Sequence, residues 1–438
     1  MTGAGRGLRA VVLAAVLCII VMPILAGLVE TARAAGGAFR DLSAMPGFLT
    51  SLRVTLVTGF AATALAVLLA AGATAGLFAR HGAAGGRWLV PVLATPHAAL
   101  AIGMAFLLSP AGWIARALAP LLGWDRPPAL VTVGDPWGMT LILGLLVKEV
   151  PFLVLMMLAA LAQLPVRAMM AAGRSLGYGP GLVWVKVILP QVYPLMRLPV
   201  FVVLAFSLTV VDVALILGPS NPPTLAVAVN RLFQGAAPGS LGAAAAGSLL
   251  LAGLVAAAIA GWLLAMRGAG ALGRIWLRRG GRGAQSAPGL RLAAGATVTL
   301  GALALLSGVM LGLWSLAFRW PWPDLLPDGW SLKGWMAPGA GWAGTALTTL
   351  CIGLLATLIS VALAIAWLEG EDRGRRRRAG WAELLVYLPL IVPQIAFLYG
   401  LNVALLRAGA GAVFWPTVWA HVLFVVPYVM IGLSVPWR

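Results

Sequence analysis

Two stretches decide the fold: Ser51–Ala70, which reads SLRVTLVTGFAATALAVLLA, and Thr345–Ala364, which reads TALTTLCIGLLATLISVALA. Each has the length, about 20 residues, that an α-helix needs to cross the apolar core of a bilayer. Aligned without gaps, the two stretches are identical at eight of twenty positions, including Gly59 with Gly353. They predict a membrane-spanning helix and, at the same time, an internal repeat.

Two further features recur in the same order after these stretches. The matched sets are Pro96-His97 with Gly103 against Pro393-Gln394 with Gly400, and Val150-Pro151-Phe152 against Val426-Pro427-Tyr428. Three features in one order indicate a duplication. The first helix of each half is expected to begin on the same side of the membrane. We therefore expect two tandem bundles in parallel repeat, with a solute pathway between them.

The composition supports the membrane interpretation. Of the 438 residues, 61% are hydrophobic and only 10% are charged, and the mean hydropathy is +0.99. A soluble domain cannot cover so much apolar surface with polar groups, whereas a bilayer solvates it. We therefore predict an all-α polytopic membrane protein.

Ten segments are long and apolar enough to span a bilayer. They are roughly 8–29, 51–79, 88–109, 137–162, 196–217, 243–266, 292–318, 343–368, 382–406 and 413–434. The first resembles a secretory signal peptide. Its apolar run is longer than is typical of one, so we interpret it as an uncleaved span.

The basic residues indicate the orientation. With the N-terminus in the cytoplasm, 20 of the 30 Lys and Arg residues fall on the inner side, 9 fall on the outer side, and Lys148 lies within a span. This asymmetry follows the positive-inside rule, so it accounts for the net charge of +18 without a nucleic-acid partner. The run Arg375–Arg378 is then predicted to anchor the chain to lipid headgroups.

Few residues could build an enzymatic or metal site. The chain has two cysteines, Cys18 and Cys351, and three histidines without ligand spacing. These numbers exclude a disulfide framework and a cysteine-based zinc site. The sequence contains no catalytic constellation and no Walker sequence. We therefore predict a non-enzymatic protein without metal or cofactor, which does not itself hydrolyse ATP.

The two halves define the expected domains. The segment 267–291 is rich in Gly and Arg and predicts a flexible cytoplasmic linker. We expect a first membrane domain at 1–266 and a second at 292–438. Measured against the first half, the second stops before a matching cytoplasmic loop and two more spans, so we expect its bundle to be incomplete.

The loop 163–195 carries the most specific pattern. Apolar residues from Val166 onward recur at helical spacing, which predicts a short amphipathic helix outside the membrane. Gly177 is expected to end that helix. Pro180 is expected to begin a second short helix, which ends near Pro190.

This loop resembles the EAA loop of binding-protein-dependent ABC transporter permeases. The family pattern is Glu-Ala-Ala, three residues, Gly, nine residues and Ile-x-Leu-Pro; here these places hold Ala171-Ala172-Gly173, Gly177 and Val187-Ile188-Leu189-Pro190. The spacing fits throughout. Two of the first three residues depart, and the loss of the Glu removes a polar group that could contact the ATPase.

The tandem arrangement resembles the fused two-domain permeases of thiamine and iron(III) importers. The resemblance implies a permease subunit in the bacterial inner membrane, in contact with membrane lipids. It also implies a periplasmic solute-binding protein that delivers the solute, and a dimeric cytoplasmic ABC ATPase that docks on the loop. The coupling residues it implies are Ala171, Ala172, Gly173, Gly177, Val187, Leu189 and Pro190. Nothing in the sequence names the solute.

Four ionisable residues lie within or beside the spans. Lys148 and Glu149 fall in the middle of the fourth span, which indicates either a pathway gate or a pair that locks helix packing, and we favour packing. Asp212, near the outer end of the fifth span, is a candidate partner of Lys148. His97 is expected to be a packed, hydrogen-bonded residue. The competing function is a proton-coupled secondary transporter that uses Lys148, Glu149 and Asp212 as its relay.

Overall fold

A computed structural model describes residues 3–237, 239–281, 287–337, 339, 341–373, 385–410, 414–434 and 437. Within these residues nine helices are long and apolar enough to cross a membrane, and one shorter apolar helix, α19 (Gln394–Arg407), accompanies them. The described strands are two short ones, β1 (Ala317–Arg319) and β2 (Gly329–Trp330), which pair antiparallel. The prediction of an all-α polytopic membrane protein is confirmed. The predicted anchor Arg375–Arg378 lies outside the described residues.

The contacts between elements group the described residues into two compact units. Unit 1 draws on Met1–Met45, Val229–Val255 and Trp335–Arg438, and unit 2 on Pro46–Ala228 and Ala256–Gly334. Three helices cross from one unit to the other along the chain: α12 (Leu225–Gln234), α13 (Ser240–Arg278) and α15 (Lys333–Met336).

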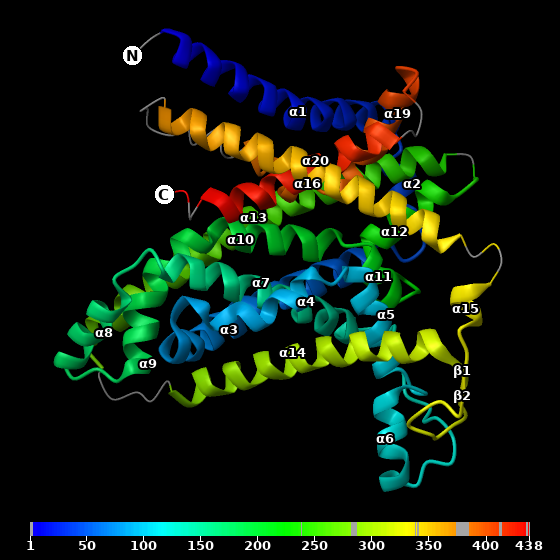
Figure 1. The fold of residues 1–438 in the computed structure, drawn as a ribbon, viewed down its shortest axis with the longest axis horizontal. Helices are drawn as coiled ribbons and strands as arrows, with labels where there is room; N and C mark the ends of the chain where they lie inside the picture. The colour runs from blue at the N-terminus through cyan, green and yellow to red at the C-terminus, as the bar shows by residue number, and fades with distance from the viewer. Residues whose placement is uncertain are drawn as a thin grey trace. The chain divides into compact units, whose positions relative to one another are not determined.

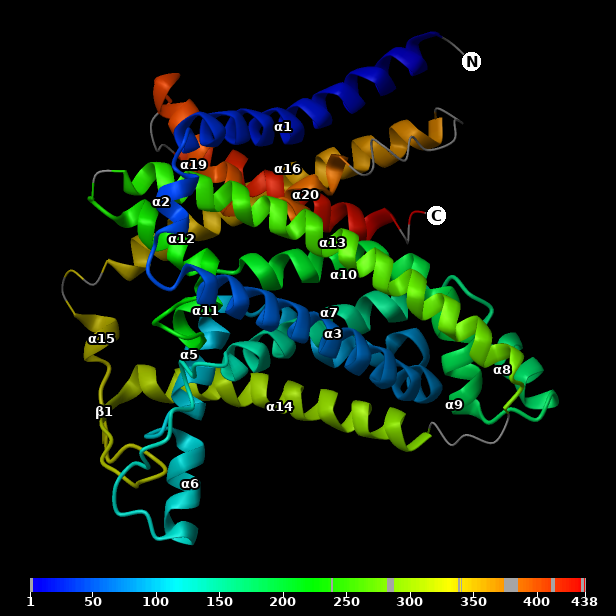
Figure 2. The same cartoon turned by 180° about the vertical axis from the view of Figure 1, so that it is seen from behind.

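Unit 2 contains the loop 163–195, which includes α8 and α9 (Figures 1 and 2). It also contains most of the buried polar residues. Besides the strands, its elements are α3 (Phe48–His81), η1 (Gly82–Leu89), α4 (Val90–Ala94), α5 (His97–Leu108), α6 (Trp113–Leu122), α7 (Met139–Leu161), α8 (Val166–Ser175), α9 (Pro180–Val183), η2 (Trp184–Ile188), α10 (Leu189–Thr209), α11 (Asp212–Leu217) and α14 (Ala287–Leu316). Its core lies where α7 is enclosed by α3, α10 and α14.

Unit 1 is built around the long helix α16. Its elements are α1 (Gly3–Ala35), α2 (Phe39–Ser43), α16 (Trp342–Arg373), α18 (Leu388–Ile391), α19 and α20 (Phe414–Ser434). In this unit α16 packs against α20, as α3 packs against α7 in unit 2. The two sequence repeats therefore place equivalent helices side by side in the same way.

Each unit contains the first helix of the other sequence half. In unit 2, α14 from the second half packs along α3 and α5, and in unit 1, α1 from the first half packs along α16 and α19. The compact units therefore do not coincide with the ranges 1–266 and 292–438, which remain a prediction about the repeat. Most of the predicted linker is also helical: α13 continues to Arg278 and α14 begins at Ala287, while residues 282–286 lie outside the description.

Matched glycines allow these exchanged helices to touch through their backbones. A Cβ atom added to Gly103 of α5 would overlap the carbonyl oxygen of Ser307 in α14. A Cβ atom added to Gly400 of α19, which matches Gly103 in the repeat, would overlap the carbonyl oxygen of Gly27 in α1. In lipid, helices associate through close packing because no hydrophobic force draws them together. The glycines provide that close approach.

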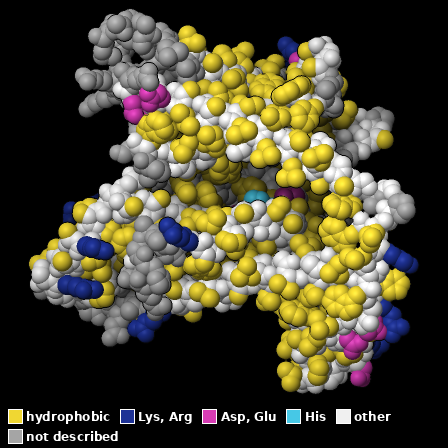
Figure 3. Space-filling view, in the orientation of Figure 1, with side chains coloured by type: hydrophobic (Ala, Val, Ile, Leu, Met, Phe, Trp, Pro, Cys, Tyr) yellow, Lys and Arg dark blue, Asp and Glu magenta, His cyan; other side chains and the backbone are white. Residues whose placement is uncertain are grey.

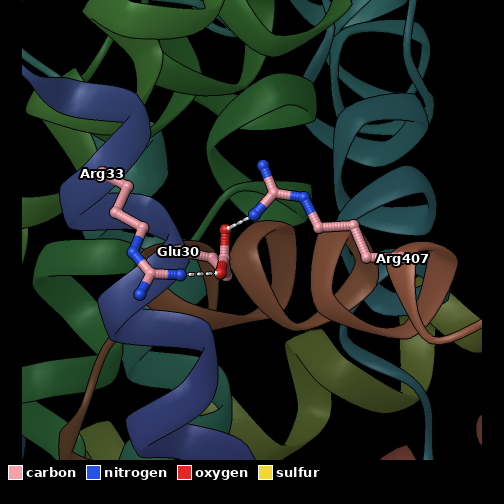
Figure 4. Close-up of polar contacts among 3 residues, drawn as sticks. All are labelled: Glu30, Arg33 and Arg407. Atoms are coloured by element: carbon pink, nitrogen blue, oxygen red, sulfur yellow. Dashed lines mark hydrogen bonds and ion pairs between the residues drawn. The ribbon is translucent and has the colours of Figure 1, made fainter.

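An ion-pair cluster holds the same two helices of unit 1 near their ends (Figure 4). Glu30 of α1 bridges two cations: its Oε1 lies 2.6 Å from Arg33 Nη1, and its Oε2 lies 2.5 Å from Arg407 Nη1 of α19. The Glu30 side chain is 12% exposed, whereas both arginines are exposed. The cluster lies one turn beyond the crossing at Gly27.

Two of the predicted spans are not continuous helices. The span predicted at 88–109 is broken between α4 and α5, where Thr95 is extended before Pro96. The span predicted at 382–406, whose first residues lie outside the description, is broken between α18 and α19, where Val392 is extended before Pro393. The cause is steric, because a proline forces the residue before it out of the helical region.

The boundaries around the loop also differ from the prediction. No helix ends near Pro190: α9, η2 and α10 form one continuous helical segment from Pro180 to Thr209. Pro190 is the second residue of α10 and follows the π-helical turn η2 directly. The span predicted at 196–217 is interrupted instead at Val210, which is extended, and a separate helix, α11, follows it.

The glycine crossings make a direct prediction. We expect Gly103→Leu and Gly400→Leu to destabilise the protein by about 1–3 kcal/mol or more, since an inserted side chain must push two backbones apart. Leu has a higher helix propensity than Gly, so any loss must come from packing. Thermal unfolding in detergent, followed by size-exclusion chromatography, measures the effect. The matched control is Gly308→Leu, because Gly308 adjoins Ser307 on α14 but has no atom near its Cβ position. Equal stability of Gly103→Leu and Gly308→Leu would contradict the crossing.

Candidate functional site

The loop 163–195 begins with α8, which ends in a well-defined cap. Gly177 has φ +80°, the left-handed conformation that glycine adopts without strain. The Gly177 N–H donates to the Arg174 carbonyl (2.9 Å), and the Tyr178 N–H donates to the Gly173 carbonyl (3.1 Å). These two bonds are the Schellman motif, which satisfies carbonyls that the helix end leaves free. Gly177 thus sets the direction in which the chain leaves α8.

Gly173 joins the two parts of the loop. It is buried, and a Cβ atom added to it would overlap the side chain of Val183 in α9. Its small size therefore serves the packing of α8 on α9. Of the three residues that stand at the Glu-Ala-Ala positions, only Ala171 and Ala172 are exposed.

Two side chains fasten the loop to neighbouring helices. The indole N–H of Trp184 donates to the carbonyl of Ala71 in α3 (3.1 Å). The ammonium of Lys186 donates to the carbonyl of Gly281, just beyond α13 (2.8 Å), and lies 4.4 Å from the ring centre of Trp276. Because both anchors are buried, the loop is fixed to α3 and to the end of α13.

The remaining predicted loop residues lie on and beside α10. Val187 is 36% exposed, Leu189 is half-buried and Pro190 is exposed. The most exposed apolar side chain at the end of α8 is Leu176, at 60%. In Figure 3 the Lys and Arg side chains visible on unit 2 gather mainly at the end that carries α8, where Arg167 and Arg174 are exposed. The exposed surface of α8 therefore combines small and apolar side chains with basic ones.

Lys148 holds the broken helix between α4 and α5. Its ammonium donates three hydrogen bonds to backbone carbonyls: Val92 (2.9 Å), Leu93 (2.9 Å) and Thr95 (2.5 Å). These carbonyls lose their helical partners because the chain turns extended before Pro96. An ammonium has three N–H donors, so Lys148 uses all of them here. The sequence analysis missed these carbonyl partners. Pro96 was the signal that could have indicated them, because a proline interrupts the helix before it and leaves carbonyls without N–H partners.

Glu149 is enclosed on the other side of α7. One carboxyl oxygen accepts a hydrogen bond from the Ser207 hydroxyl of α10, and the other has no partner among the described atoms. Ser207 Oγ also lies 3.5 Å from Thr63 Oγ1 of α3. Glu149 thus lies where α3, α7 and α10 meet, near the middle of α7.

His97 and Asp212 lie at two breaks in the helices. His97 is the first residue of α5, is half-buried, and stacks on Phe206 with a centroid distance of 4.9 Å. Asp212 is the first residue of α11, which packs on α5, and it is exposed. Among the described residues no ion pair joins Asp212 to Lys148, and the Lys148 ammonium donates to the three carbonyls instead. Lys148 instead neutralises the negative end of a short helix.

Comparisons with known proteins support the predicted permease family. No protein-family model matches the chain. The chain is 30% identical over 355 residues to the inner membrane ABC transporter permease protein YnjC of Escherichia coli (strain K12). The alignment covers 80% of this chain and 60% of the E. coli protein, so the chain spans less than two thirds of that relative's length. The resemblance to inner-membrane ABC transporter permeases is confirmed.

The contacts of Lys148 make a prediction that separates it from its neighbour. Lys148→Met leaves three carbonyls without donors, and we expect a loss of stability of about 1–3 kcal/mol, measured by thermal unfolding in detergent. Glu149→Gln keeps a carbonyl oxygen that can accept from Ser207, so we expect a much smaller loss. If Lys148→Met unfolds at the same temperature as the unmodified protein, the ammonium does not hold the break together.

Proposed function

We propose that this chain, a homologue of an inner-membrane ABC transporter permease, is the membrane-spanning permease subunit of an ATP-binding-cassette importer. It forms the solute pathway, and its loop 163–195 docks on a cytoplasmic ATPase. The observation that carries the proposal is the loop. A twenty-residue spacing that matches the EAA pattern coincides with a capped, anchored helical hairpin at the basic end of unit 2.

The contacts supply a physical route from the ATPase to the middle of the membrane. A displacement of α8 is transmitted to α9 through the contact of Gly173 with Val183. It is transmitted to α3 through the hydrogen bond of Trp184. The helical segment Pro180–Thr209 then carries it to Ser207, which is bonded to Glu149 of α7. Next to Glu149, Lys148 holds the break before α5. The route consists of rigid contacts throughout.

The surface of the loop defines the partner. Ala171 and Ala172 form a shallow exposed strip, Leu176 projects beyond them, and Arg167 and Arg174 flank them. Such a surface fits an apolar groove with an acidic rim, since buried apolar area provides affinity and complementary charge provides orientation. In this chain the arginines supply the charged contacts, because the acidic residue of the family pattern is replaced by Ala171.

The rest of the assembly follows from the permease role. Two ATPase subunits drive the movement by binding and hydrolysing ATP, and a periplasmic solute-binding protein delivers the solute at the opposite face. The N-terminus lies in the cytoplasm, in agreement with the 20-to-9 distribution of basic residues. The proton-relay alternative has less support, since Lys148 is occupied by three backbone carbonyls.

The turn at Gly177 can be tested with matched substitutions. Thr at position 177 must adopt a left-handed conformation at a cost of about 1–2 kcal/mol. Thr at Gly179, where φ is −65° and a helix begins, is an acceptable N-cap. We expect Gly177→Thr to weaken recovery of the ATPase with the purified chain roughly five- to thirtyfold. We expect Gly179→Thr to have little effect, and Gly177→Asn to be intermediate. Equal recovery with both threonine variants would show that the turn does not present the docking surface.

The orientation can be tested with single cysteines in a chain that lacks Cys18 and Cys351. Ala168 is exposed on α8, and Asp125 is exposed after α6. An impermeant maleimide added to intact cells, after permeabilisation of the outer membrane, should label Asp125→Cys. Ala168→Cys should react only once the inner membrane is opened. Labelling of position 168 from outside would place the loop in the periplasm and remove the proposed coupling role.

A further inference from the structure

Unit 2 contains an apolar cavity beneath α6. Its volume is about 530 Å³, and its walls come from α3, α6, α7 and the segment that follows α6. The residues that define it are Leu65, Ile114, Leu118, Ile142, Leu143 and Leu146. A cavity of this volume lies within the range of small-molecule binding pockets.

Two threonine hydroxyls in the cavity wall are bonded to the backbone. The Thr132 hydroxyl donates to the Leu108 carbonyl (2.6 Å), and the Thr140 hydroxyl donates to the Thr132 carbonyl. Nearby, Asp135 caps α7 by accepting from the N–H groups of Met139 (2.8 Å) and Thr140 (2.9 Å). The wall thus offers little to a polar ligand or to water, and apolar cavities of this kind stay dry unless an apolar molecule enters them.

The helix α6, which forms one wall of the cavity, is of the kind found at membrane interfaces. Both ribbon views show α6 running across the direction of α3 and α14 (Figures 1 and 2). Leu121 and Leu122 of α6 are 79% and 54% exposed, while Arg116 on the same helix is buried. A short helix with one apolar face, lying across the ends of membrane spans, is suited to the boundary between headgroups and acyl chains.

Hydrogen bonds hold α6 to the segment between β1 and β2. Arg116 donates to the carbonyls of Pro321 (2.5 Å) and Asp324 (2.9 Å), in the segment between β1 and β2. Trp113 donates from its indole to the Leu325 carbonyl (2.7 Å). These bonds fix α6 to that segment independently of any ligand, so the cavity is preformed.

The open side of the cavity has an apolar rim. Its rim residues Leu65 and Met139 are 42% and 64% exposed. Leu68 follows Leu65 by one turn of α3 on the same face and is 67% exposed. The wall from Met139 to Leu146 extends about 10 Å along α7. The open side is thus continuous with an exposed apolar surface, of the kind that a bilayer covers with acyl chains.

We propose that this cavity binds one acyl chain of a phospholipid from the surrounding bilayer. The chain enters past Leu65 and Met139, lies under α6, and fills the space that Ile142, Leu143 and Leu146 leave open. Its headgroup stays at the level of α6. The lipid thereby completes the packing between α6 and the spans α3 and α7. This inference does not depend on the transported solute or on the ATPase.

A photoactivatable phosphatidylethanolamine with a diazirine on its acyl chain tests the proposal. The full-length protein is reconstituted into vesicles of phosphatidylethanolamine and phosphatidylglycerol that contain this probe, irradiated, and digested for mass spectrometry. We expect the peptide of α7 that carries Ile142, Leu143 and Leu146 to be labelled several-fold more than the exposed apolar part of α16 around Leu354 and Leu358.

Matched tryptophan variants provide the control. Leu65→Trp should fill the entrance and reduce labelling of the α7 peptide several-fold, whereas Leu68→Trp, one turn away and outside the cavity wall, should leave it unchanged. Leu118→Trp tests the same space from α6. Thermal unfolding identifies any variant that has lost its fold. If the α7 peptide is labelled no more than α16, or if neither folded cavity variant lowers its labelling, the cavity does not hold an acyl chain.

Discussion

The structure depends on close contact between helix backbones in a solvent that gives no hydrophobic force to bring them together. Gly103 against Ser307 in unit 2 and Gly27 against Gly400 in unit 1 meet this constraint at matched positions of the sequence repeat. In both units the contact joins the first helix of one half to the third span of the other. Each half therefore supplies a helix to the unit built mainly by the other, and neither half is an independent body.

A second constraint is that every backbone polar group in a membrane needs a partner. The breaks before Pro96 and Pro393 free carbonyl groups, and at the first break the three donors of Lys148 satisfy them. Glu149, one residue later, reaches Ser207 in the helical segment that begins at the loop. The break before α5, the helix α7 and the helical segment that begins at the loop are thus joined by the hydrogen bonds of Lys148 and Glu149. Under the proposed coupling role, these bonds would carry a movement of the loop to the middle of α7.

Much of this architecture could be predicted from the sequence because membrane spans and turn glycines have local signals. The apolar segments located the spans, and Gly177 located the end of α8. The sequence analysis failed where the outcome depends on distant contacts. Asp212 was the candidate partner of Lys148 because opposite charges attract, but the hydrogen bonds of Lys148 go to carbonyls freed by Pro96. The role of Gly173 against Val183, and the exchange of α1 and α14, required the packing to be known.

The central claim is that α8 transmits movement from an ATPase. The most direct test is cross-linking from a cysteine at Ala172, in a chain without Cys18 and Cys351, in membranes that also contain the ATPase and the solute-binding protein. The account predicts a cross-linked peptide from the groove of a Walker-motif ATPase, with a yield that changes when vanadate traps the nucleotide. If the ATPase purifies with the chain and hydrolyses ATP, yet cross-links to another surface and never to position 172, the loop is not the coupling element.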